Sequence, residues 1–172
     1  MANLGIGATP PTTPATTPNP IKRLDAMVPA ERPSDPGWEG LDMSFAPTFS
    51  AGRLGGAQTA LFGGRVEAGY RLTGGDKASL WAVGEAHAGI GNGLNTGIGA
   101  GLRGELGRRH LNVYGSVIPQ LNAGISANGL TAGVAIRSAA GVQIGDFFGE
   151  VAKENGTNMN MTSVALGVRA RF

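Results

Sequence analysis

From residue 41 to the end of the chain, apolar and polar residues alternate with a period of two. This is the spacing of a β-strand whose two faces meet different surroundings. The last nine residues, 164–172, show the pattern clearly, because apolar residues occupy the even positions while Arg169 and Arg171 lie between them. Short segments rich in glycine, asparagine and aspartate interrupt the pattern. Together they predict eight antiparallel strands between residues 41 and 172.

The charged residues of these predicted strands share one face. Outside residues 147–153, every strand charge falls on the parity opposite to the apolar residues. These charges are Asp42, Arg65, Glu67, Arg71, Glu85, Arg103, Glu105, Arg137, Arg169 and Arg171. In residues 147–153 the pattern is mixed, because Lys153 shares the parity of Phe147 whereas Phe148 shares that of Glu150. Strands with one apolar and one polar face, ~9 to 11 residues or longer, are typical of transmembrane β-barrels.

An eight-stranded barrel has an interior that side chains can fill. Arginines and carboxylates that point inward must then pair, because an isolated charge in a narrow lumen is costly. Glycines at inward positions leave room for the long arginine side chains. We therefore predict a plugged, salt-bridged lumen. Its charge network would consist of Arg65, Glu67, Arg71, Glu85, His87, Arg103, Glu105, Arg137, Glu150, Arg169 and Arg171.

Turn signals predict where the strands end. Asn128-Gly129 and Asn155-Gly156 are each expected to form a tight hairpin, because both residue types tolerate positive φ. Pro119 lies on the apolar parity of the fifth strand. Since proline cannot donate to a ladder and a closed barrel has no free edge, we expect a β-bulge at this position.

Residues 1–40 have a different composition, with many prolines and, in the first half, threonines between them. Such a sequence resists both helix and sheet, so we expect a disordered, extended tail over residues 1–40 and a barrel domain over residues 41–172. Residues 1–20 contain no basic segment followed by an apolar one, so no signal peptide is expected there. No run of ~18 apolar residues predicts a transmembrane helix.

Composition and motifs argue against several kinds of chemistry. The net charge is +2 with no cluster of lysines, so a basic patch for nucleic acid is not expected. Cysteine is absent, which excludes thiolate ligands and nucleophiles. Residues 99–104 match GxGxxG, but they lie within a predicted strand and no helix follows, so we do not expect a dinucleotide site. His87 and His110 lie far apart, and no serine has a histidine and an acid as neighbours. We expect no enzyme activity, cofactor or metal.

Residues 41–172 resemble the small eight-stranded outer-membrane barrels of the OmpA and OmpX type. The last strand is similar to the C-terminal assembly signal of that family, which ends in an aromatic residue. The matching positions are Gly167, Val168, Ala170 and Phe172. Ala170 is smaller than the apolar residue usual at its position. The resemblance implies insertion into a lipid bilayer by the outer-membrane assembly machinery, a location in the bacterial outer membrane, and both termini in the periplasm.

The first functional hypothesis is a non-enzymatic outer-membrane barrel with a structural or narrow-pore role. The alternative is a phage virion component, either a tail or head assembly protein or an ejected protein that forms a conduit through the host outer membrane. The apolar faces would then pack against other virion subunits or further copies of the chain, and the tail would lie across them. A lipocalin-like soluble barrel needs an apolar interior, which the arginine-bearing face opposes.

Overall fold

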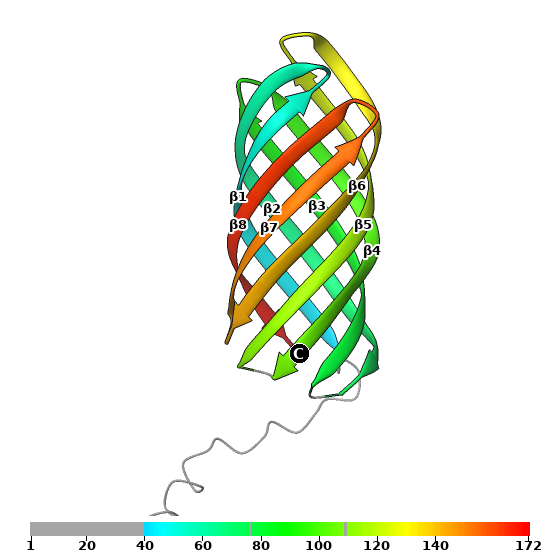
Figure 1. Cartoon of the computed structure of the whole chain (residues 1–172), viewed down its shortest axis with the longest axis vertical. Coiled ribbons are helices and arrows are strands. Elements are labelled where there is room, and N and C mark those ends of the chain that lie inside the picture. Colours follow the sequence, from blue (N-terminus) through cyan, green and yellow to red (C-terminus); the bar gives the residue numbers. More distant parts are fainter. Residues whose placement is uncertain (1–39, 76, 109) are drawn as a thin grey trace, which may run out of the picture. The chain divides into compact units, whose positions relative to one another are not determined.

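The alternating segments form a closed barrel in which each strand pairs with its neighbours in sequence (Figure 1). The computed structural model describes residues 40–75, 77–108 and 110–172. The strands are β1 (Leu41–Leu54), β2 (Ala57–Gly74), β3 (Ala78–Gly91), β4 (Leu94–Arg108), β5 (Leu111–Ser126), β6 (Gly129–Ile144), β7 (Phe147–Gly156) and β8 (Met159–Arg171). The prediction of an eight-stranded antiparallel up-and-down barrel is confirmed. Of the expected tail, only Gly40 lies within the described residues.

Pairing of β1 with β8 closes the barrel, with Asp42 opposite Arg171 and Leu54 opposite Met159. The two ends of the barrel domain are hydrogen-bonded to each other. The amide of Gly40 donates to the carbonyl of Phe172 (3.3 Å), and the amide of Phe172 donates to the carbonyl of Leu41 (3.0 Å). We call this the termini end, which Figure 1 marks with the C-terminus. The opposite end, which carries the β1–β2, β3–β4, β5–β6 and β7–β8 turns, is called the distal end.

Side chains alternate between a buried interior and an exposed exterior along every strand. The exterior carries the large apolar residues: Phe62 is 65% exposed, Leu166 is 74% exposed and Leu130 is 80% exposed. The interior carries the charges, and Arg103 and Arg169 are 0% and 1% exposed. The barrel is therefore apolar outside and ionic inside, the reverse of a water-soluble domain. No helix among the described residues is long and apolar enough to cross a membrane.

Two turns differ from those predicted from asparagine-glycine pairs. The β5–β6 turn is formed by Ala127 and Asn128, and Gly129 begins β6 with a φ of 104°. The predicted hairpin at Asn155-Gly156 is displaced by two residues, because both residues remain in β7 and pair with Asn160 and Met159. The longer hairpin keeps the inside parity of both strands and brings Met159 into contact with the apolar residues of the lumen.

The β-bulge expected at Pro119 is absent from the ladders that contain this residue. Pro119 pairs with Ile136 in a regular register on the β6 side. On the β4 side, the pairs before and after the proline, Gly99 with Gln120 and Leu102 with Val117, keep the same register. Proline therefore interrupts the β4–β5 pairing locally without inserting a residue. The register shift among the described pairs lies elsewhere, between Arg71 and Thr73 on β2.

Candidate functional site: the ion-paired lumen

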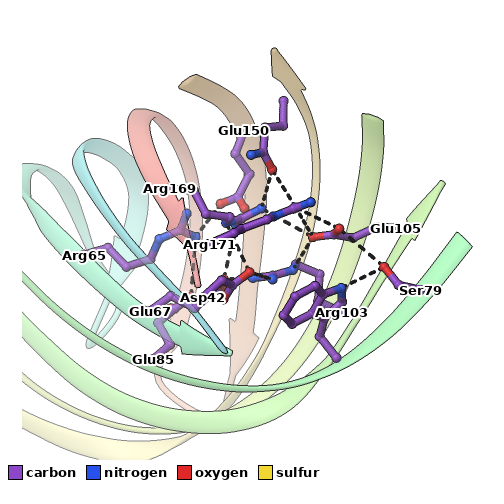
Figure 2. A network of polar contacts seen from close by, with 12 residues as sticks. Asp42, Arg65, Glu67, Ser79, Glu85, Arg103, Glu105, Glu150, Arg169 and Arg171 are labelled. Atoms are coloured by element: carbon purple, nitrogen blue, oxygen red, sulfur yellow. Dashed lines mark hydrogen bonds and ion pairs between the residues drawn. The ribbon is translucent and has the colours of Figure 1, made fainter. Parts of the chain in front are cut away.

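Six charged side chains fill the lumen towards the termini end, and all of them are labelled in Figure 2. We call them the lower cluster. Its members are Asp42, Glu67, Arg103, Glu105, Arg169 and Arg171. They come from β1, β2, β4 and β8, and all lie on the inward parity of their strands. Three carboxylates and three guanidinium groups leave the cluster neutral in formal charge.

Arg103 is the centre of the lower cluster. Its two terminal nitrogens contact Asp42 and Glu67, and its Nε lies 3.0 Å from Oε1 of Glu105. The planar guanidinium group thus faces one carboxylate in each of three directions, an arrangement that lysine could not reproduce. Arg103 therefore connects β1, β2 and β4 through the interior of the barrel.

The other two arginines of the lower cluster come from the last strand. Arg169 Nη2 donates to Glu67 Oε1 at 3.2 Å, and Arg171 Nη2 donates to Glu105 Oε2 at 2.8 Å. Oε1 of Gln143, on β6, accepts from Arg169 Nη1 at 3.3 Å and from Arg171 Nη2 at 2.9 Å. The last strand is therefore tied to β2, β4 and β6 across the lumen.

Aromatic rings cover the arginines of the lower cluster. The centre of the Trp81 ring lies 5.1 Å from Cζ of Arg103, and Tyr114 and Phe148 lie 4.8 and 4.9 Å from Cζ of Arg169. Cation–π contacts of this kind are stronger when the cation is removed from water. Trp81 Nε1 also donates to Ser79 Oγ at 2.8 Å. These rings were absent from the network predicted from the sequence, although their inward parity could have indicated them.

A second group, the middle cluster, consists of Arg65, Glu85, Arg137 and Glu150. Both arginines contact Glu150, and their Nη1 atoms lie 3.4 and 3.1 Å from Oε2 of Glu85. Gln120 Nε2 donates to Oε1 of Glu85 at 2.7 Å. The four charges thus form a closed ring of alternating sign, buried at the centre of the barrel.

Weaker polar contacts and then apolar side chains continue the lumen towards the distal end. Oε1 of Glu154 lies 3.9 Å from Nε of Arg137, and Nδ1 of His87 lies 3.9 Å from Oε1 of Glu85. A cavity of about 20 Å³ lies beside these groups, which is room for about one water molecule. Beyond it, five apolar side chains pack together: Leu54, Leu61, Ala135, Met159 and Met161. The lumen is filled by side chains over most of its length.

Most residues that the sequence assigned to the lumen network lie within these contacts, but Arg71 does not. Its guanidinium group forms no ion pair with the described residues and lies 6.0 Å from the centre of the Trp81 ring. Arg71 is exposed at the termini end, next to the register shift of β2. The predicted network omitted several polar residues that the structure places in the lumen contacts, among them Asp42, Gln120, Gln143 and Glu154.

The residues matched to an assembly signal lie on both faces of β8. Gly167 faces inward, whereas Val168 and Ala170 face outward and Phe172, at the chain end, is 62% exposed. No group of three or more histidine, aspartate or glutamate residues within the described ranges is arranged to hold a metal ion. Most of the charges that the described residues place in the lumen are paired with charges of the opposite sign.

No family model and no curated sequence matches the chain. Several solved structures are similar to it. Neisserial surface protein A is 13% identical with a TM-score of 0.58, over 78% of this chain and 98% of that protein. Ail of Yersinia pestis, the attachment invasion locus protein, is 13% identical with a TM-score of 0.53, over 77% of this chain and 99% of that protein.

The N-terminal β-barrel domain of Pseudomonas aeruginosa OprF is also similar, at 15% identity and a TM-score of 0.50, over 75% of this chain and 97% of that domain. At such low identity the likeness concerns the fold. The eight closed strands, the ionic interior and these matches lead to one conclusion. The chain has the fold of the small eight-stranded outer-membrane barrels of the OmpA and OmpX type.

Proposed function

We propose that this chain spans the bacterial outer membrane as a non-enzymatic barrel whose filled lumen gives it a structural role. The observation that carries the proposal is the distribution of side chains, with large apolar residues around the outside and the ion pairs inside. An apolar exterior of this extent is costly in water and is rare on soluble monomers. A lipid bilayer removes that cost while the closed barrel satisfies the backbone hydrogen bonds.

Aromatic residues on the exterior support this placement. Phe49 on β1 pairs with Phe62 on β2, Phe45 lies four residues before Phe49 on β1, and Tyr70, Phe147 and Phe172 lie towards the termini end. Tyrosine and phenylalanine are common near the two boundaries of the hydrocarbon layer. The neighbours with solved structures are outer-membrane proteins, which agrees with the proposed location.

The packing of the lumen favours a structural role over conduction. Two ion-paired clusters and an apolar group follow one another along the barrel axis, and the cavity between them holds about 20 Å³. An ion would have to displace charges that are already paired and buried. We therefore propose that the inserted barrel does not conduct ions.

The test is to refold the full chain with vesicles of neutral phospholipid that enclose a fluorescent dye sensitive to the entry of ions. We expect the protein to remain with the vesicles after an alkaline wash, to migrate differently on gels before and after heating, and to leave the dye signal unchanged when salt is added outside. A chain that stays monomeric and soluble without lipid or detergent would contradict the membrane role. A ring-shaped oligomer formed without detergent would favour the virion component instead.

Phe172→Ala is expected to lower insertion into the outer membrane of cells several-fold, because the terminal aromatic would be the residue that the assembly machinery recognises. Refolding into vesicles that lack any protein should be unchanged, since Phe172 is exposed and makes no lumen contact. Phe147→Ala is the matched control, because Phe147 is also an exposed aromatic at the termini end and pairs beside β8. Equal losses for both variants in cells would refute a specific role for Phe172.

A further inference from the structure

The outer face of the barrel is not uniformly apolar. Seven exposed polar residues form a continuous area on β1, β2, β6, β7 and β8 towards the distal end, which we call the outer polar patch. Its members are Arg53, Gln58, Ser138, Lys153, Asn155, Asn160 and Thr162. None of the lumen contacts described above involves these side chains.

Two cross-strand rows build the patch. In the first, Lys153 lies between Ser138 on β6 and Thr162 on β8, its direct pairing partners. In the second, which lies nearer the distal end, Asn155 pairs with Asn160, Asn160 with Arg53, and Arg53 with Gln58. Directly opposed residues on one face of an antiparallel pair are within contact distance, so each row is a line of adjacent polar groups.

The patch is more than the polar rim expected where any barrel leaves the bilayer. On β6, the exposed residues Leu130, Val134 and Ile136 lie nearer the distal end than Ser138, and all three are apolar. The next outward-facing row towards the termini end is again apolar, with Val151 paired to Val164. Lys153 therefore lies within the height that the apolar surface covers on β6. A lysine that faces acyl chains is destabilising, most strongly at the centre of a bilayer and least near its surface.

The charge of the patch is positive and is not neutralised by the chain's described residues. Arg53 and Lys153 are its two cations, and the carboxylates of the strands point into the lumen. The remaining members are amides and hydroxyls, which can donate hydrogen bonds beside the two cations. A group with several negatively charged oxygens, such as a phosphate, fits this combination.

We propose that the outer polar patch binds the phosphate of a lipid headgroup in the leaflet at the distal end. The inference rests on the proposed membrane location. A lipid fits better than free phosphate because Val151 and Val164 border the patch on the side of the termini end, where the acyl chains of the same molecule would pack. The bound phosphate would neutralise Lys153 and so remove the cost of its position on the lipid-facing surface.

The test uses the full chain inserted in nanodiscs of phosphatidylcholine, with phosphatidylglycerol added in steps as the anionic lipid. Binding is followed by native mass spectrometry of the released protein. The variant R53Q/K153Q should bind phosphatidylglycerol about 25-fold more weakly, at about fivefold for each cation removed from a membrane surface. The matched control is K77Q/R108Q, which removes two exposed cations at the termini end. The swap R53K/K153R keeps both charges and should bind as the native chain does.

Each outcome is decisive. Loss of phosphatidylglycerol binding in R53Q/K153Q but not in K77Q/R108Q supports the proposed binding at the outer polar patch. Equal loss in K77Q/R108Q, or no loss in either variant, overturns that proposal. Competition by free inorganic phosphate as strong as that of the lipid overturns the assignment to a headgroup. Since binding is measured after insertion into neutral lipid, failure of every variant and of the native chain to insert would instead refute the proposed membrane function.

Discussion

Replacing Arg103 by methionine is expected to lower the free energy of unfolding by about 3 to 5 kcal/mol, the cost of leaving buried charges without their partner. Arg103 is fully buried and contacts Asp42, Glu67 and Glu105, so its loss leaves three carboxylates with two arginines. Methionine keeps much of the side-chain volume, which limits the effect to charge. The measurement is urea unfolding of the folded protein in micelles, followed by its gel migration.

Two controls make this result specific. Arg108→Met removes a charge from the exposed end of the same strand and should change the stability by less than about 0.5 kcal/mol. Adding Glu67→Gln to Arg103→Met removes one of the carboxylates that lose their contact with Arg103 and should restore part of the loss. The opposite outcome would be that Glu67→Gln lowers the stability of Arg103→Met by as much as it lowers the stability of the native chain. In that case the two residues would not be coupled.

Gly167→Val is expected to prevent closure of the barrel or to destabilise it by at least about 1 to 3 kcal/mol, the usual cost of overpacking. A Cβ atom at this position would meet the carbonyl oxygen of Phe45 and would lie 2.7 Å from Cβ of Ala46 and from Cε1 of Phe148. The obstruction includes backbone of β1, which cannot rotate away. The expected readout is loss of the compact, heat-sensitive gel band after refolding into vesicles.

Gly84→Val is the matched control, because a Cβ atom at Gly84 meets nothing within 4 Å and the residue faces outward on β3. Valine suits an exposed strand position, so this variant should fold as the native chain does. Normal folding of Gly167→Val would show that β1 and β8 can separate at this point without cost. It would leave Gly167 with a role in recognition by the assembly machinery alone.

The sequence predicts the barrel well because the side chain of every second residue reports the face on which it lies. Parity alone places Arg65, Glu67 and Arg169 in the lumen. It does not detect a displacement by two residues, which keeps every side chain on its original face. The hairpin predicted at Asn155-Gly156 shows this, since the displaced turn still places Glu154 and Met159 inside.

Partners within the lumen could not be predicted for a different reason. Arg103 meets Asp42, 61 residues earlier in the chain, because strand tilt and the closure of β1 on β8 bring β1 and β4 face to face across the interior. Periodicity gives the direction of a side chain and not its height along the barrel. The same limit explains Arg71, which has inward parity but lies at the exposed end of β2.

The hydrogen bonds between Gly40, Leu41 and Phe172 have a consequence for synthesis of the chain. The first strand can obtain its second neighbour only after β8 has been made, because β1 and β8 pair with each other. Until then a nascent or truncated chain has two unpaired edges, which can pair with other chains and aggregate. Folding of the chain before β8 has been made therefore carries a risk of aggregation.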